Sequence, residues 1–195
     1  MAEMENQQRF LTQDRDLLGR LRQYFDSLPA RVRDGQGWLI FNAGRERGAR
    51  VSRFIAEQVA SYRPFLSSYS VAWSDFALDA YIAKVELPAS HNAIATESAH
   101  VQQEYQIAGQ VSRDMHYHML YADVFTVGNV APAHLHELEH LGAVVLERSA
   151  RRLPTLILTP RSPEEMTAWC RELDATGAAW RRIYERMYET SLIAL

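Results

Sequence analysis

Apolar residues along the chain follow two patterns, a helical spacing and short unbroken runs. Between 13 and 28 they recur three or four residues apart, at Leu17, Leu21 and Phe25 among others, which predicts a helix that Pro29 ends. Short apolar runs bounded by Gly, Asn, Ser or Asp are typical of buried strands. These runs predict strands at 38–41, 68–73, 122–127, 153–159 and 192–195. Helical spacing predicts further helices at 51–62, 76–85, 101–119, 132–152, 163–173 and 177–188, with a loop over 88–99.

Strands that alternate with helices predict an α/β fold of three layers, a mostly parallel sheet flanked by helices. The 195 residues suit a single domain over 1–195, with 1–34 as an N-terminal helical lead-in. Ligands of such folds bind at the carboxyl ends of the strands. The loops at 42–50, 128–132 and 159–163 are therefore the candidate site.

Composition restricts the partners and the compartment. The formal net charge is −3, which does not support nucleic acid as a partner, although a local contact stays open. No apolar run approaches the roughly 18 residues of a membrane span, so we expect no membrane. The polar N-terminus is unlike a secretory signal, and Cys170 is the single cysteine, so we expect a cytoplasmic protein without disulfides.

Four segments in a fixed order point to a known family. They are GWLIFNAGRERGARVSRFIAEQVA at 37–60, YADVFTVGN at 121–129, HLHELEHLGAVVLERSARRLPTLILTPRS at 134–162 and AAWRRIYERMYETSLIAL at 178–195. Together they resemble the ATPase domain of DnaC-type helicase loaders and of IstB-type transposition helper ATPases, over nearly the whole chain. The resemblance implies a P-loop NTPase-like, AAA+-like fold.

The segment that resembles the phosphate loop lacks the residues that hold phosphate. A working loop reads G-x-x-x-x-G-K-[ST], with the lysine on the β/γ-phosphates and the hydroxyl on Mg²⁺. Here Gly44 and Gly48 keep the glycines, whereas Ala49 stands at the lysine position and Arg50 at the hydroxyl position. The loop also carries arginines, so we interpret it as a degenerate phosphate loop that binds an anion or a partner through Gly44, Arg45, Arg47, Gly48 and Arg50.

The family's acidic magnesium ligands are missing as well. The resemblance places them at Gly128 and Asn129, and Asp123 lies at the other end of that strand. We therefore expect no ATP hydrolysis and no cofactor. The resemblance also implies that arginines near the ends of later helices contact a neighbouring subunit, and the matching positions here are Arg148, Arg182 and Arg186.

A second motif offers an alternative chemistry. His136, Glu137 and His140 satisfy H-E-x-x-H on a predicted helix, where both histidines would bind zinc and the glutamate would be the general base. The charged Glu139 inside the motif and the lack of a strong third ligand favour a polar helix face instead. We therefore expect no metal, and we expect His136→Ala and His140→Ala to leave the fold unchanged. The wider histidine set of His116, His118, His134, His136 and His140 could form an adventitious metal site, but we expect no physiological metal there.

The sequence thus favours a non-catalytic, ATPase-like protein-interaction domain, an accessory factor in DNA replication, recombination or transposition. Its expected partner is another protein, namely an ATPase, a helicase or a second copy of the chain. Two alternatives stay open: a zinc-dependent hydrolase that uses the HELEH motif, and a nucleotide-binding domain that does not hydrolyse.

Overall fold

A computed structural model describes residues 2–62, 65–86 and 99–195 of the chain. Its strands are β1 (Gly37–Ile40), β2 (Ser68–Ala72), β3 (Val124–Gly128), β4 (Thr155–Leu158) and β5 (Ser191–Ala194). Its helices are α1 (Ala2–Asp26), α2 (Leu28–Asp34), α3 (Arg45–Ala60), α4 (Trp73–Tyr81), the π-helical turn η1 (Ile82–Glu86), α6 (Ala99–Tyr121), α7 (Leu135–Ala150), α8 (Pro163–Leu173) and α9 (Ala178–Thr190). The loop predicted at 88–99 lies outside the described residues apart from its last position.

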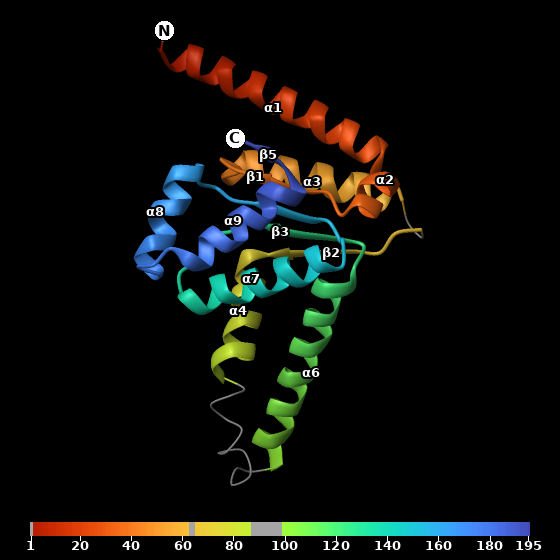
Figure 1. Ribbon diagram of the computed structural model, residues 1–195, viewed down its shortest axis with the longest axis vertical. Coiled ribbons are helices and arrows are strands. Elements are labelled where there is room, and N and C mark those ends of the chain that lie inside the picture. The colour runs from red at the N-terminus through yellow and green to blue at the C-terminus, as the bar shows by residue number, and fades with distance from the viewer. Residues whose placement is uncertain (1, 63–64, 87–98) are drawn as a thin grey trace.

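The five strands form one sheet in the order β2-β3-β4-β1-β5, and every pair is parallel. The predicted C-terminal strand is therefore confirmed, since β5 pairs with β1 along its whole length. Helices cover both faces of the sheet (Figure 1), so the predicted three-layer α/β architecture is confirmed as well.

Successive residues of β1 supply two separate cores because side chains alternate across a strand. Trp38 and Ile40 pack with α1 and α3 on one face. Leu39 lies on the opposite face, in the core that α4, α7 and α9 cover. Crossover connections are right-handed. Helix α3 connects β1 to β2 and therefore lies on one face of the sheet. Helices α4, α7 and α9 belong to connections that cross the sheet in the opposite direction, so they lie on the other face.

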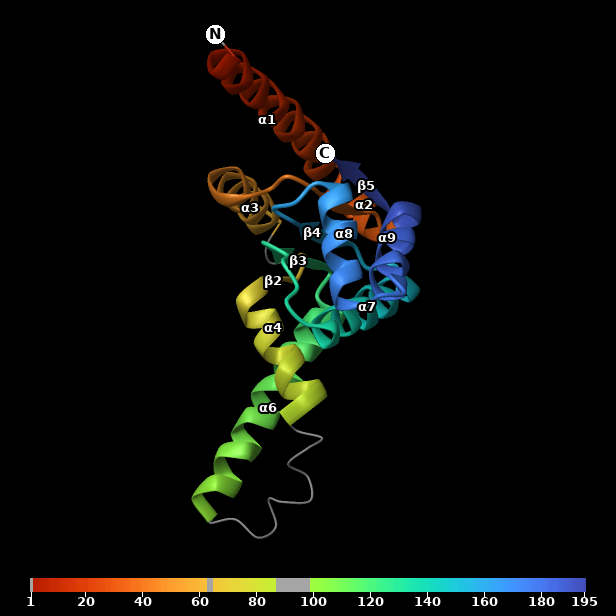
Figure 2. The ribbon, with the colours of Figure 1, turned by 90° about the vertical axis from the view of Figure 1, so that its left-hand side faces the viewer.

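Helix α6 projects from this body as an arm. Figure 2 shows it leaving the sheet beside α4 and ending far from the strands. Among the described residues of α6, Ser112 is buried and Met119 lies fully buried in the core near the C-terminal end. The arm is therefore anchored at one end.

Several helix boundaries differ from the predicted ones, and two of the differences have a clear physical reason. Pro29 does not end the helical lead-in but lies in the first turn of α2, where its missing N–H costs nothing. Helix α3 begins at Arg45, six residues before the predicted start. None of the described helices combines the length and the apolar character that crossing a bilayer requires.

Candidate functional site

A cleft of about 520 Å³ opens at the carboxyl end of the sheet. This is where parallel α/β folds bind ligands, and the volume falls within the range of small-molecule sites. Its walls are Ala43, Gly48, Ala49, Ser52, Ser70, Val71, Ala72, Thr126, Gly128, Asn129 and Leu158. The structure thus brings the degenerate phosphate-loop residue Gly48 to the same cleft as both degenerate magnesium positions.

The segment expected to form a phosphate loop is helical. Gly44 is the N-cap of α3, and the N–H of Gly48 donates to its carbonyl oxygen at 3.2 Å. Arginine, glutamate and alanine at 45–50 are good helix formers, which explains the early start. A backbone loop that wraps around phosphates is therefore absent between β1 and α3, two elements within the described residues.

Close packing explains the glycine at 48. A Cβ atom there would lie 2.3 Å from the carbonyl oxygen of Ala43, closer than real Cβ atoms come. The segment before α3 is fixed in turn, because the N–H of Ala43 donates to Thr159 and that of Asn42 to Arg161. The cleft floor is therefore a rigid junction between the ends of β1 and β4.

The cleft walls carry no charged side chain among the described residues that line them. Their polar groups are hydroxyls and the amide of the exposed Asn129, whose backbone is left-handed with φ 59°. Asp123 accepts hydrogen bonds from the N–H and hydroxyl of Ser67 at the opposite end of β3, as its position in the sequence predicts. The cleft therefore lacks the lysine and carboxylates that hold Mg²⁺ and triphosphate in P-loop ATPases.

Two arginines of the predicted anion-binding set point to α1 instead of the cleft. The Nε of Arg47 lies 2.8 Å from Asp14 Oδ1, and Arg50 pairs with the other oxygen of the same carboxylate. The guanidinium of Arg47 also donates to the carbonyl oxygen of Asn42 at 3.1 Å. Arg47, which is largely buried, thus ties α1 to α3, while Arg45 is the first residue of α3.

Of the three arginines expected at a subunit contact, Arg148 does not fit that role. It is fully buried and donates to the carbonyl oxygens of Met119, Ala122 and Pro154 at 2.7–2.9 Å. A side chain with no exposed surface cannot contact a second subunit. Arg182 is exposed on α9, and Arg186 pairs with Glu189 at 3.1 Å.

The HELEH motif is not a polar helix face, so this part of the sequence interpretation was wrong. Glu137 and His140 are buried, with exposed fractions of 5% and 2%. Glu137 accepts a hydrogen bond from the N–H of Ala133 at 2.8 Å, which satisfies a free amide before α7. His136 stacks on His134 near the start of the helix. The motif's three residues therefore serve different neighbours and do not form one ligand set.

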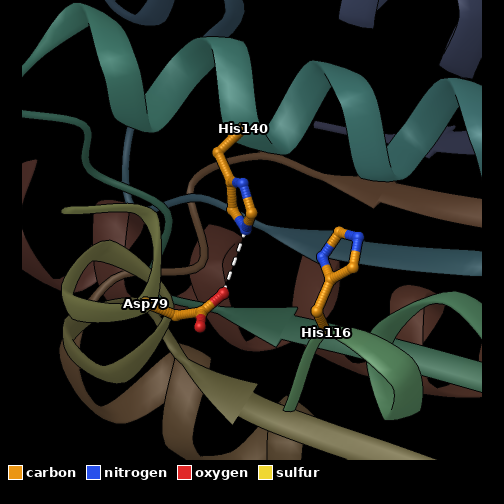
Figure 3. A group of neighbouring side chains, drawn as sticks. All are labelled: Asp79, His116 and His140. Atoms are coloured by element: carbon orange, nitrogen blue, oxygen red, sulfur yellow. Dashed lines mark hydrogen bonds and ion pairs between the residues drawn. The ribbon is translucent and has the colours of Figure 1, made fainter. Parts of the chain in front are cut away.

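His140 instead meets two residues from other helices (Figure 3). Its Nε2 lies 3.1 Å from Asp79 Oδ2 on α4, and its ring lies 5.6 Å from that of His116 on α6. The hydroxyl of Ser112 donates to Asp79 Oδ1 at 2.7 Å. Burial lowers the pKa of His116, and the neighbouring His140 lowers it further. The sequence analysis named both histidines within one wider set, but it gave no signal for Asp79.

Comparison of the sequence with protein-family models and with curated proteins finds no match for this chain.

Proposed function

We propose that this chain is a P-loop ATPase-like domain that has lost nucleotide hydrolysis and acts by binding another protein. The observation that carries the proposal is the uncharged cleft, which lies between the degenerate phosphate-loop helix and the degenerate magnesium positions. The strand–helix order and the parallel sheet agree with the family that the sequence resembles. The partner would be an ATPase, a helicase or a second copy of the chain, in DNA replication, recombination or transposition.

The cleft argues against phosphoryl transfer on chemical grounds. That reaction depends on cations that neutralise charge as it develops on the phosphates. Ala49 and Gly128 supply no charge, and Arg47 is engaged by Asp14. Uncharged walls of this kind suit a neutral or weakly polar group.

The arm supports the protein-binding part of the proposal. Ile107, Val111 and Tyr117 are exposed on α6 by 54%, 60% and 59%. At about 100° per residue, Ile107 and Val111 lie about 40° apart on one face of the helix, and Tyr117 lies about 80° from Ile107 on the other side. Apolar side chains grouped on an exposed face are typical of protein interaction sites.

Titration with nucleotide tests the loss of hydrolysis. The melting temperature of the purified chain should not change with MgATP or MgADP, and phosphate release should stay at background. A nucleotide at a hundred times its dissociation constant would add about 2.7 kcal/mol of stability. Saturable stabilisation without turnover would favour the nucleotide-binding alternative. Turnover that Gly48→Asp abolishes would refute the proposal.

Affinity purification from the source cell tests the partner. The double variant Ile107→Glu/Val111→Glu should lose the partner that the wild type retains. The matched control is Gln106→Glu/Arg113→Gln, which lowers the net charge by the same two units at exposed positions about 100–120° around the helix from Ile107 without removing apolar surface, and it should keep the partner. Equal recovery with both variants would place the interface elsewhere. Light scattering on the purified chain tests self-association.

We also place the protein in the cytoplasm. The lone Cys170 is buried, and burial raises the pKa of its thiol to about 12. It therefore stays a protonated core residue with no described cysteine to pair with, which suits a reducing compartment. Fractionation of the source cell tests the location.

A further inference from the structure

We infer that Asp79, His116 and His140 form a binding site for a divalent transition metal, zinc by the chemistry of the donors, that clasps the α6 arm to the body. The three ligand atoms all lie within 4.8 Å of one another. They come from α4, α6 and α7, and Figure 3 shows the three side chains converging from these elements on one point. This inference does not depend on the function proposed for the cleft.

The donor set selects the metal. Two imidazoles and one carboxylate suit zinc, with bonds of about 2.0–2.2 Å and a fourth position for water. Calcium and magnesium prefer sites built from oxygen ligands. An imidazole pair therefore disfavours these abundant ions and favours zinc or a neighbouring transition metal.

The geometry needs only a small adjustment. Tetrahedral ligands at these bond lengths lie about 3.3 Å apart. The pair of His140 Nε2 and Asp79 Oδ2 is already at 3.1 Å, and His116 completes the set within 4.8 Å. His116 is half-buried, so its ring has room to turn toward the other two.

Charge supplies a second argument. Asp79 is only 2% exposed, and a buried carboxylate is costly without compensation. Among the described residues, the basic group within ion-pair distance of Asp79 is His140. One proton can bridge that pair, but it leaves the lone pair of His116 unused. A divalent cation neutralises the carboxylate and binds both rings.

The surroundings fit a metal site. Ser112 donates to the second oxygen of Asp79 and so orients the carboxylate, as hydrogen-bond partners of metal ligands usually do. The site lies near the C-terminal end of α6, where Met115 and Met119 next to His116 pack on the core. A bound ion would add direct bonds to the hydrogen bonds that already link the three helices through Asp79, and so fix the direction of the arm.

Metal binding by the full chain tests the inference. After treatment with a chelator, the wild type should take up one zinc per chain, measured by calorimetry and by elemental analysis. Cobalt in place of zinc should give the visible absorption of a four-coordinate ion. Zinc at a hundred times its dissociation constant should raise the ratio of folded to unfolded protein about a hundredfold, seen as a higher melting temperature.

Variants distinguish this site from the stacked surface pair of His134 and His136. His116→Gln and Asp79→Asn should each weaken zinc binding at least about tenfold, while their metal-free circular dichroism stays that of a folded protein. His118→Gln, on the same helix, and His136→Gln should bind as the wild type does.

Three results would overturn the inference: no zinc uptake by the wild type, unchanged affinity in His116→Gln, or a loss confined to His136→Gln. X-ray absorption at the zinc edge gives a check that needs no variant. Two imidazole ligands with oxygen are expected, and a spectrum without imidazole excludes this site.

Discussion

Replacing Arg148 with methionine is expected to destabilise the protein strongly, because this buried arginine joins backbone segments at the end of α6 and before β4. Its guanidinium donates to three carbonyl oxygens around the ends of α6 and the start of β4, and its Nε donates to Thr155 Oγ1 at 3.1 Å. Methionine keeps the apolar stem and most of the volume. It removes the arginine donor from all four acceptors, of which Pro154 O still accepts from the N–H of Phe125 at 3.3 Å.

These contacts set the size of the expected loss in the free energy of unfolding. A buried polar group left unpaired costs about 1–3 kcal/mol, and carbonyl oxygens fall toward the lower end. The loss is offset in part because methionine avoids burying a charge. That burial is costly enough to lower the pKa of Arg148 to about 9, although the charge of Asp123 raises it. We therefore expect a net loss of about 2–4 kcal/mol, or about 4–16 °C in melting temperature for a chain of this size.

Urea unfolding followed by circular dichroism measures the loss. Arg182→Met removes an exposed arginine and serves as the control, with an expected change within about 0.5 kcal/mol. Arg148→Lys should fall between the two, because one ammonium cannot reach every acceptor. If Arg148→Met is no less stable than Arg182→Met, the interior role assigned to this arginine is incorrect.

Three further predictions follow from the structure. Gly48→Ala should lower the free energy of unfolding because its Cβ meets a backbone oxygen, whereas Gly19→Ala, with nothing within 4 Å, should leave that free energy equal or raise it by up to about 1 kcal/mol. Urea unfolding measures both, and the reverse order would contradict the close approach. Asp14→Asn should weaken the contact of α1 with α3 by about 1 kcal/mol, because it removes the charge opposite Arg47, and the difference from wild type should shrink in high salt. Burial lowers the pKa of His116 below the pKa of about 6.5 expected in the unfolded chain, so protonation favours the unfolded state. The free energy of unfolding is therefore highest above about pH 6.5 and falls as the pH drops below that value. Thermal unfolding of metal-free protein between about pH 5 and pH 7.5 should show a smaller pH dependence in His116→Gln than in the wild type.

The exposed apolar face and one ligand of the proposed metal site, His116, both lie on α6. If the metal fixes the direction of the arm, a partner that binds Ile107 and Val111 meets a preorganised helix. Affinity for that partner should then fall when zinc is removed and recover when it is restored, since ordering the arm costs free energy on binding. An affinity independent of zinc would separate the two proposals.

Local patterns in the sequence were sufficient for the secondary structure and the fold class. The unbroken apolar run Trp38–Phe41 predicted a strand buried on both faces, and the structure buries all four of its side chains. The alternation of such runs with helical segments predicted a parallel sheet, because parallel strands need crossover helices. The start of α3 was missed because the resemblance suggested a phosphate loop, whereas the residues at 45–50 favour a helix.

Contacts between distant segments were decided by the tertiary structure alone. Spacing on α7 placed His136 and His140 one turn apart. The packing of α7 on the sheet directs His140 into the core, against Asp79, which is 61 residues away in the chain. The same holds for Arg148, whose neighbours are set by where α6 and β4 meet. Periodicity determines which face of an element is apolar, but the partner of a buried polar side chain depends on which elements pack together.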